Sequence, residues 1–501
     1  MRHAFAILLL IPALALAQKG AEDKKPKKAE DAAAKKEDAK PPKWTAIVGG
    51  KVWPVSRPPI EDGIVLLKND KIFAVGPRRE LSVPKGADVI DASGRHVAPG
   101  FVASAASGAL GARGTSSREK AKDKVDPFSD VMLFCLAAGI TTAHEGPGGR
   151  RGFFPGRGGG GSAFSGTPTG MVGGVIGKLT YGTIKGFELR DPAGVYMTNT
   201  ARGGAASTQT DAALKKAYEY RKKRNAWYRD LAAKKKDLKE PKADATTKAL
   251  ARCLDREIPL FMSASSQKQI KDVLELVDRY DAPMIVHDGL EAWTMAREIG
   301  QRPVKLLLTH RGKNSRAGTR PYRDPHRTQP HGWTIRNGAL LSQAGVRWAT
   351  ITVGKGVNTS LFPGRDLMGL TMEACFSVRG GVTSTEALRS VTLSAAEILH
   401  VDDRVGSLDA GKDADVLVMD REPLDYRSFV DLAFVNGRLA YDRAKVDLWN
   451  HIQTDRSKGL KKWKPWGPWP ELRATDTPEV GNGNGNGNGN GNGNGNGNGN
   501  N

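Results

Sequence analysis

Histidine and carboxylate side chains follow short apolar runs at three places in the chain, where they could bind a divalent metal ion. His144 and Glu145 follow one run, His287 and Asp288 a second, and His310 a third. Imidazoles and carboxylates are common zinc ligands, and bound zinc lowers the pKa of water from about 15.7 to about 7. His144, His287, Asp288 and His310 are therefore a candidate residual site. The more ordinary interpretation is that these are structural or surface histidines.

The segments that must position these groups have two textures. Residues 44–100 and 402–443 are rich in short β-type runs that Gly, Asn-Asp and Pro interrupt, which predicts antiparallel sheet. Between them, apolar runs alternate with helical patterns over residues 101–401. That alternation predicts an α/β fold with parallel strands.

The two ends of the chain carry no pattern typical of a core. Residues 1–17 have a basic start, an apolar run and an Ala-Leu-Ala site, which predict a cleaved signal peptide and a mature chain that begins at Gln18. We therefore expect an exported protein, periplasmic or secreted. Residues 18–43 are a predicted disordered linker of Lys, Ala, Glu and Pro, and 444–501 a Trp/Lys-rich segment with a Gly-Asn tail. No other run is long enough to predict a membrane span.

The net charge of +22 and a pI near 9.8 allow an anionic polymer as partner but do not identify one. A Gly-Arg segment at residues 146–161 and a basic helix predicted over 211–242 would be its contacts, although a solvated surface is the preferred interpretation. Three isolated cysteines argue against a disulfide framework or a cysteine zinc site. A small molecule, a protein partner and a homo- or hetero-oligomer all remain open.

A set of motifs near the C-terminal end carries a family resemblance. Residues 392–396 (TLSAA), 406–408 (GSL), 411–415 (GKDAD) and 435–437 (VNG) are similar to hallmark segments of the amidohydrolase family, in its imidazolonepropionase-like branch. The resemblance covers roughly residues 44–443. It implies a (β/α)8 TIM-like barrel over 101–401, with a composite β-sandwich from 44–100 and 402–443. It also implies water activation on one or two divalent metals.

The resemblance identifies the positions at which the family holds its metals. On the first strand, after a Pro-Gly turn, the two histidines of the family are replaced by Ala105 and Ser107. On the fourth strand Tyr196 takes the place of a lysine that serves, when carboxylated, as a metal bridge. On the fifth strand both histidines are replaced by Ser263 and Ser265. None of these five side chains supplies an imidazole or a carboxylate.

Two further positions complete the comparison with the family. On the sixth strand direct pairing places Asp288 where the family has histidine, and a slip of one residue would place His287 there instead. On the eighth strand Val353 takes the place of the aspartate that accepts a proton from water. We therefore predict a catalytically inactive homologue that binds a ligand or partner, with no cofactor. The alternative is an active hydrolase of carbon–nitrogen bonds with a rebuilt zinc site.

Overall fold

The computed structural model describes residues 41–110, 121–123, 125–147, 170–198, 205–310, 332–352, 357–358 and 369–446. The chain divides into the units Met1–Pro42 and Lys43–Asn501, and the elements below all belong to the second. The predicted signal peptide, residues 18–40 of the linker, most of the Gly-Arg segment and the tail beyond residue 446 lie outside the described residues. Among the described helices, none is long and apolar enough to cross a membrane.

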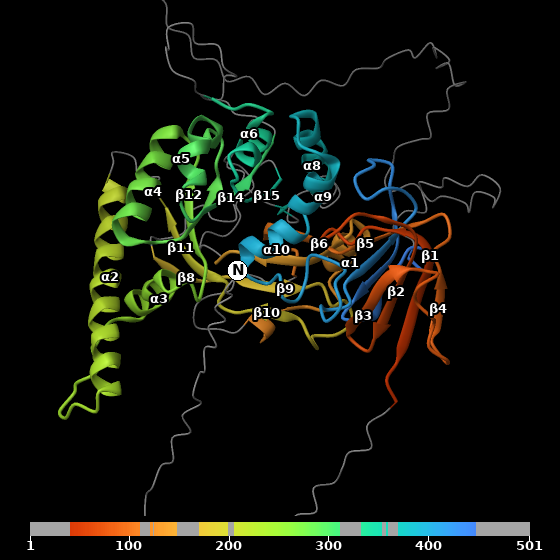
Figure 1. The fold of residues 1–501 in the computed structure, drawn as a ribbon, viewed down its shortest axis with the longest axis horizontal. Helices are drawn as coiled ribbons and strands as arrows, with labels where there is room; N and C mark the ends of the chain where they lie inside the picture. The colour runs from red at the N-terminus through yellow and green to blue at the C-terminus, as the bar shows by residue number, and fades with distance from the viewer. Residues whose placement is uncertain are drawn as a thin grey trace, which may run out of the picture. The chain divides into compact units, whose positions relative to one another are not determined.

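Strands from both ends of the chain form one eight-stranded sheet (Figure 1). Its order is β19-β18-β17-β5-β1-β2-β3, with β4 also paired to β1. The C-terminal strand β17 is antiparallel to β5, so segments more than 300 residues apart are directly hydrogen-bonded. The strands are β1 (Trp44–Val52), β2 (Ile60–Lys68), β3 (Lys71–Pro77), β4 (Asp88–Asp91), β5 (His96–Pro99), β17 (Val416–Met419), β18 (Val430–Val435) and β19 (Arg438–Asp442).

Two glycines explain the turns of this sheet. Gly411, in the GKDAD motif, has a φ of +89°, a conformation that side chains with a Cβ rarely adopt. Gly437 has a φ of +68°, and a Cβ there would lie 1.9 Å from the carbonyl oxygen of Asn69. The VNG segment therefore needs glycine because the β18–β19 turn approaches the β2–β3 turn closely.

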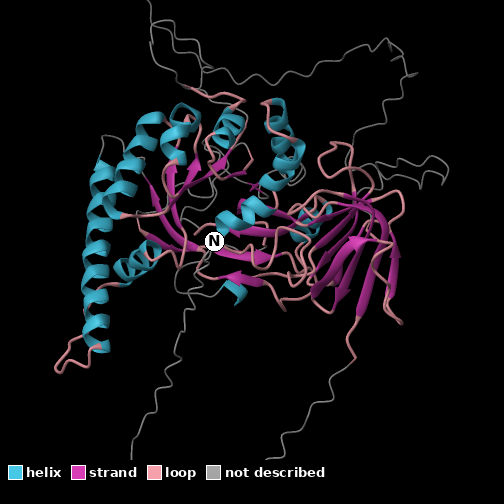
Figure 2. Cartoon of the chain, viewed as in Figure 1, coloured by secondary structure: helices cyan, strands magenta, loops and turns pink. Residues whose placement is uncertain are grey.

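The middle of the chain contributes two further sheets, visible beside the helices in Figure 2. One has the order β10-β9-β7-β6-β16 and the other β15-β14-β13-β12-β11-β8. Strands β11 to β15 are parallel, as the sequence predicted, while β8 and β9 run antiparallel to their neighbours. The strands are β6 (Phe101–Ser107), β7 (Ile140–Glu145), β8 (Met171–Gly173), β9 (Val175–Lys178), β10 (Glu188–Arg190), β11 (Gly194–Thr198), β12 (Leu260–Ala264), β13 (Met284–Asp288), β14 (Val304–Leu308), β15 (Trp348–Thr350) and β16 (Val357–Asn358).

Helices follow most of these strands. Helix α4 begins with a capping box between Ser266 and Gln269, and its apolar residues recur at helical spacing on the buried face. The basic helix predicted over 211–242 is instead α2 (Ala205–Ala232), which starts earlier and ends earlier. The others are α1 (Asp130–Ala137), α3 (Ala245–Leu254), α4 (Gln267–Tyr280), α5 (Ala296–Gly300), α6 (Asn337–Gln343), α8 (Gly369–Arg379), α9 (Ser384–Ser390) and α10 (Leu393–Leu399), with 3-10 turns at Ala121–Asp123 and Ala292–Met295.

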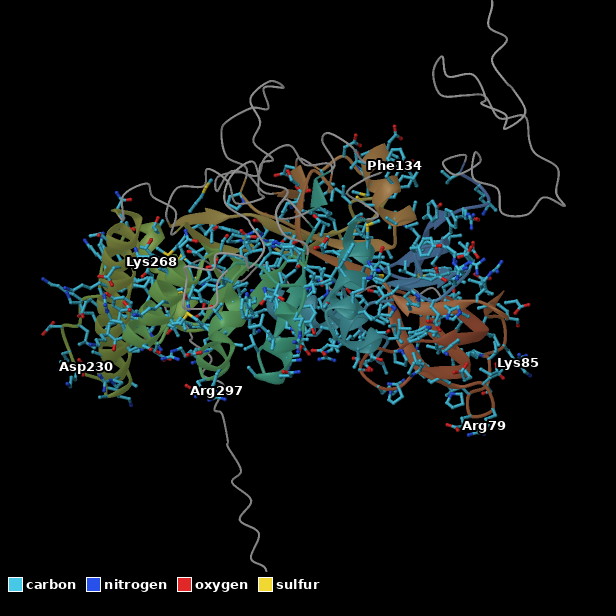
Figure 3. All side chains as sticks on the ribbon, turned by 90° about the horizontal axis from the view of Figure 1, so that it is seen from above. Arg79, Lys85, Phe134, Asp230, Lys268 and Arg297 are labelled. Atoms are coloured by element: carbon cyan, nitrogen blue, oxygen red, sulfur yellow. The ribbon has the colours of Figure 1, made fainter. Side chains whose placement is uncertain are left out.

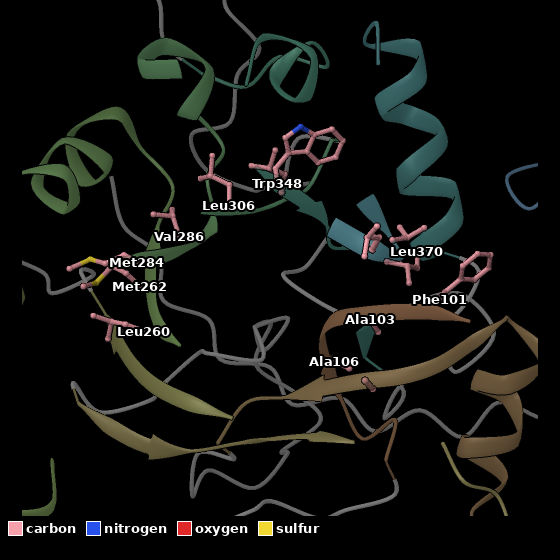
Figure 4. Close-up of a cluster of buried hydrophobic side chains, with 14 of the residues drawn as sticks. Phe101, Ala103, Ala106, Leu260, Met262, Met284, Val286, Leu306, Trp348 and Leu370 are labelled. Carbon is pink, nitrogen blue, oxygen red and sulfur yellow. The ribbon is translucent and has the colours of Figure 1, made fainter. Parts of the chain in front are cut away.

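Alternating strand residues build two distinct core layers. On β12, Leu260 and Met262 join the layer that packs against the helices, shown in Figure 4. Phe261, between them, joins a second layer on the other face of the sheet. That second layer also takes Val102 of β6 and Ile176 of β9, so both central sheets contribute to one apolar interior. Residues of α10 complete this interior layer.

Candidate functional site

The positions that the family uses for metal ligands lie at the carboxyl ends of β6, β11 and β12. Ala105 and Tyr196 are buried members of the interior layer. Ser263 is buried, and Ser107 and Ser265 are partly exposed. Because neighbouring parallel strands end at the same edge of a sheet, Tyr196 and Ser263 lie near that common edge. The side chains that gather there supply hydroxyl groups and an aromatic ring.

His144 is the histidine of β7, and both of its ring nitrogens are occupied. Its Nδ1 lies 2.8 Å from the carbonyl oxygen of Ser104, which can only accept, so Nδ1 carries the proton. Its Nε2 lies 2.6 Å from the hydroxyl of Tyr196 and accepts a hydrogen bond from that hydroxyl. The lone pair that would bind a metal is therefore engaged by Tyr196.

Aromatic stacking fixes this pair in the interior. Phe261 packs against both rings, with its centroid 4.8 Å from that of His144 and 4.8 Å from that of Tyr196. Burial lowers the pKa of His144 to about 4, and burial also raises the pKa of the Tyr196 phenol well above its usual value. Both groups are thus neutral at physiological pH. A neutral, stacked and hydrogen-bonded pair occupies the place where the family's bridging lysine would lie.

Glu145, next to His144, serves the segment that follows β6. Its Oε1 accepts the backbone N–H of Leu110 at 2.8 Å. Burial raises the pKa of Glu145 to about 7, opposed by hydrogen bonds from the backbone of residues 108–110. This carboxyl group therefore holds local backbone rather than facing an open site.

Strand alternation distinguishes His287 from Asp288 on β13. Ile285 belongs to the interior layer, whereas Met284 and Val286 belong to the helix-facing layer. His287 has the same parity as Ile285 and pairs in register with Ser263. Asp288 ends the strand with a φ of +91° and accepts a hydrogen bond from the hydroxyl of Ser265. His287 therefore shares the interior side with Ser263, while Asp288 contacts the segment after β12.

His310 lies away from these groups. Leu306 and Leu308 belong to the helix-facing layer, and His310 follows them with the same parity. Its ring meets Trp348 edge to face at 5.0 Å, and its Nε2 lies 3.1 Å from Thr350 Oγ1. Burial lowers the pKa of His310 to about 3. This histidine packs among outer-layer side chains and does not join His144.

The residues present do not fit the metal that the family implies. His144 has no available nitrogen, and His310 lies on the other face of its sheet, which leaves His287 and Asp288 of the four candidates. Among the described residues, no three His, Cys, Asp or Glu side chains are grouped as a metal site would need. Val353, the eighth-strand position, lies outside the described residues. One imidazole and one carboxylate among hydroxyl groups fall short of a zinc site, which usually takes three or four imidazole, thiolate or carboxylate ligands.

Two features escaped the sequence analysis. Phe261, two residues before Ser263, was not among the predicted site residues, although strand alternation could have placed it in the interior. Lys178 of β9 is fully buried and bridges Asp413, at 2.5 Å, and Asp415, at 3.1 Å. Both aspartates belong to the GKDAD motif, so ion pairs with this motif connect strand β9 to the segment that leads into the terminal sheet. The pairing of a motif carboxylate with a distant lysine had no local signal.

Comparisons with known proteins agree with this fold. The model of the amidohydrolase family matches residues 333–440. An imidazolonepropionase from Streptococcus pyogenes serotype M49 is 29% identical over 102 residues, which is 19% of this chain and 24% of that protein. The chain thus aligns with about a quarter of the length of this curated relative.

Solved structures extend the similarity beyond the matched segment. The crystal structure of an amidohydrolase from Thermotoga maritima aligns with a TM-score of 0.60 at 21% identity, over 80% of this chain and 100% of that one. A zinc-bound adenosine deaminase from Xanthomonas campestris aligns with a TM-score of 0.43 at 14% identity, over 80% of this chain and 94% of that one. The matched segment and the sequence relative thus support the amidohydrolase family over the C-terminal part of the described chain, and the solved structure shows a similar fold.

Proposed function

We propose that this chain is a non-hydrolytic member of the family, which binds a ligand or a partner without a catalytic metal. The observation that carries the proposal is the His144–Tyr196 hydrogen bond of 2.6 Å, stacked against Phe261. In this hydrogen bond the Tyr196 hydroxyl takes up the Nε2 lone pair of His144, which a metal ion would otherwise use. The replacement of family ligands by Ala105, Ser107, Ser263 and Ser265 supports the same conclusion.

The chemistry of the family reaction explains why the remaining candidates, His287 and Asp288, would not suffice to hold a catalytic metal. Hydrolysis of a carbon–nitrogen bond at neutral pH needs an activated water, and zinc supplies one by lowering the water pKa by about 9 units. A metal held by His287 and Asp288 alone would keep most of its coordination to solvent. Such a site would bind weakly and would exchange its metal readily.

We further propose that the two central sheets close into the (β/α)8-like barrel of the family. Three contacts between the sheets support closure. Ser104 Oγ lies 3.4 Å from the carbonyl oxygen of Thr350, and the backbone N–H of Ala193 donates to Gly174 at 3.0 Å. The shared interior layer, with Val102 from one sheet and Phe261 from the other, is the third. In a closed barrel the strand ends would form a single mouth.

The chemistry of that mouth indicates the class of ligand. Ser263 supplies a hydroxyl at the end of β12, and Thr352 is a buried hydroxyl just after β15. The Ser265 hydroxyl donates to the carboxylate of Asp288 at the same end of the strands. Hydroxyls donate and accept hydrogen bonds without a fixed charge. We therefore propose an uncharged polar small molecule as the ligand.

Export is a separate part of the proposal and rests on residues 1–17 alone. The basic start, apolar run and Ala-Leu-Ala site support cleavage before Gln18 and a periplasmic or secreted protein. N-terminal sequencing of the protein recovered from outside the cytoplasm should start at Gln18. Retention of Met1 on that fraction would contradict export by cleavage.

Metal content and hydrolysis together test the central proposal. Purified protein, dialysed against zinc and then against buffer, should retain far less than one zinc per chain by elemental analysis. It should not hydrolyse cyclic amides, dipeptides or amidines. Stoichiometric metal with chelator-sensitive hydrolysis would overturn the proposal and support the rebuilt site.

The matched variants are His287→Ala and His310→Ala. Both remove a buried imidazole, and only His287 lies on the interior side. If a rebuilt site exists, His287→Ala should abolish both metal and hydrolysis while His310→Ala retains them. If the proposal holds, neither variant changes a metal content that is already low.

A further inference from the structure

The C-terminal end of α2 and the turn after it form a basic, exposed projection, defined here as the α2 tip (residues 221–242). Figure 1 shows this end of α2 running past α3 into the turn, and Figure 3 shows Asp230 at the edge of the described chain. No described residue from 221 to 242 is buried, whereas Leu214, Ala217 and Tyr220 earlier in the helix are. The first part of α2 thus packs against the protein and the tip does not.

The charge of the α2 tip is strongly positive. It has ten basic and three acidic residues. Two of the basic residues, Arg221 and Arg224, turn inward and pair with Asp255 at 2.9 and 2.5 Å. Seven of the remaining eight are lysines: Lys222, Lys223, Lys234, Lys235, Lys236, Lys239 and Lys242. All seven are exposed, and one of them, Lys235, forms an ion pair with Asp230 at 2.7 Å.

Apolar side chains are exposed among these lysines. Tyr228 is 54% exposed and Leu231, one helical turn later, is 50% exposed. Trp227 is partly buried, and its ring lies 4.9 Å from that of Tyr228. A helix end with Trp, Tyr and Leu beside clustered lysines matches the composition of segments that lie at the interface of a lipid bilayer.

We propose that the α2 tip is a peripheral binding surface for an anionic lipid bilayer. The lysines would lie near the anionic headgroups, and Tyr228 and Leu231 would insert at the boundary with the acyl chains. A nucleic acid backbone would also attract the lysines, but it would gain nothing from Leu231. Lysine, moreover, carries a compact point charge on a flexible stem, whereas the planar fork of arginine suits bidentate recognition of individual phosphates.

Vesicle sedimentation of the full chain tests the proposal. Vesicles rich in phosphatidylglycerol should bind the protein at low salt, about 0.05 M, and release it at about 0.5 M, where screening shortens the Debye length. Purely phosphatidylcholine vesicles should bind little. Absence of binding to the anionic vesicles at low salt would overturn the proposal.

Two matched triple variants separate the tip from the general positive charge. Changing Lys234, Lys236 and Lys239 to Gln should lower partitioning roughly a hundredfold, since each lysine near the surface contributes about fivefold. Changing three exposed lysines elsewhere, Lys85, Lys122 and Lys185, to Gln removes the same charge and should have little effect. Equal losses in the two variants would show diffuse attraction and overturn the assignment. All six side chains are exposed, so unchanged circular dichroism is expected.

A single apolar variant distinguishes a bilayer from a nucleic acid. Leu231→Ser should weaken binding to anionic vesicles by about tenfold through lost apolar burial, and leave any binding to single-stranded DNA unchanged. If Leu231→Ser has no effect on vesicles, while the tip lysine variant loses DNA binding, the partner is a nucleic acid and the bilayer proposal is wrong.

Discussion

The hydroxyl of Tyr196 should contribute measurably to stability, because it is the donor that satisfies His144. Replacement of Tyr196 by Phe keeps the ring in its stack with Phe261 and removes only the O–H. The change leaves the Nε2 of His144 as a fully buried acceptor without its donor. An unsatisfied buried polar group costs about 1–3 kcal/mol, which is a substantial part of a typical free energy of unfolding of about 5–15 kcal/mol.

A second tyrosine provides the control. The hydroxyl of Tyr280 donates to Asp211 at 2.8 Å, and Asp211 is partly exposed and also pairs with Arg279 at 2.6 Å. Loss of this hydroxyl leaves the acceptor with its other partner and with solvent. Tyr280→Phe should therefore cost less than about 1 kcal/mol.

Urea denaturation of both variants at pH 7, followed by circular dichroism, gives the two free energies of unfolding. Acidification should narrow the difference between Tyr196→Phe and wild type, because the freed Nε2 can take a proton more easily and the pKa of His144 rises. Equal stability of Tyr196→Phe and wild type at pH 7, or a loss no greater than that of Tyr280→Phe, would refute the claim that this hydroxyl saturates His144.

Three further predictions concern charge, pH and the family ligand positions. Lys178→Met should cost about 3–5 kcal/mol in urea denaturation, since the buried carboxylate of Asp415 loses its cation. Asp413 keeps Lys71 and Arg404 as partners. Stability within about 1 kcal/mol of wild type would contradict this. The pKa values of His144, about 4, and His310, about 3, lie below the unfolded value near 6.5. The unfolded chain therefore binds more protons, and the free energy of unfolding should fall from pH 6.5 towards 4, by up to about 1.4 kcal/mol per pH unit for each histidine; a flat profile would argue against their burial. Restoring histidine at Ala105 and Ser107 should produce neither stoichiometric zinc in elemental analysis nor hydrolysis, and a loaded double variant would show a more complete ligand set.

Strand positions and the family resemblance could be predicted from local patterns. Apolar runs with glycine and proline turns predicted β strands at both ends and a parallel α/β middle, because those patterns depend on neighbouring residues. The GKDAD and VNG segments carried the family resemblance, and the first of them contains Gly411, whose φ is +89°. The loss of imidazoles at Ala105, Ser107, Ser263 and Ser265 is likewise a statement about residue types in sequence.

The partners of those residues depended on packing between segments far apart in the chain. His144 meets a hydroxyl 52 residues away, and Lys178 meets a carboxylate 237 residues away. Strand parity placed His287 on the interior side and His310 in the outer layer, although both follow similar apolar runs. A local pattern specifies which residues a strand contains, whereas its neighbours in the sheet decide which face is interior. Whether a histidine is free to act is therefore a property of the tertiary structure alone.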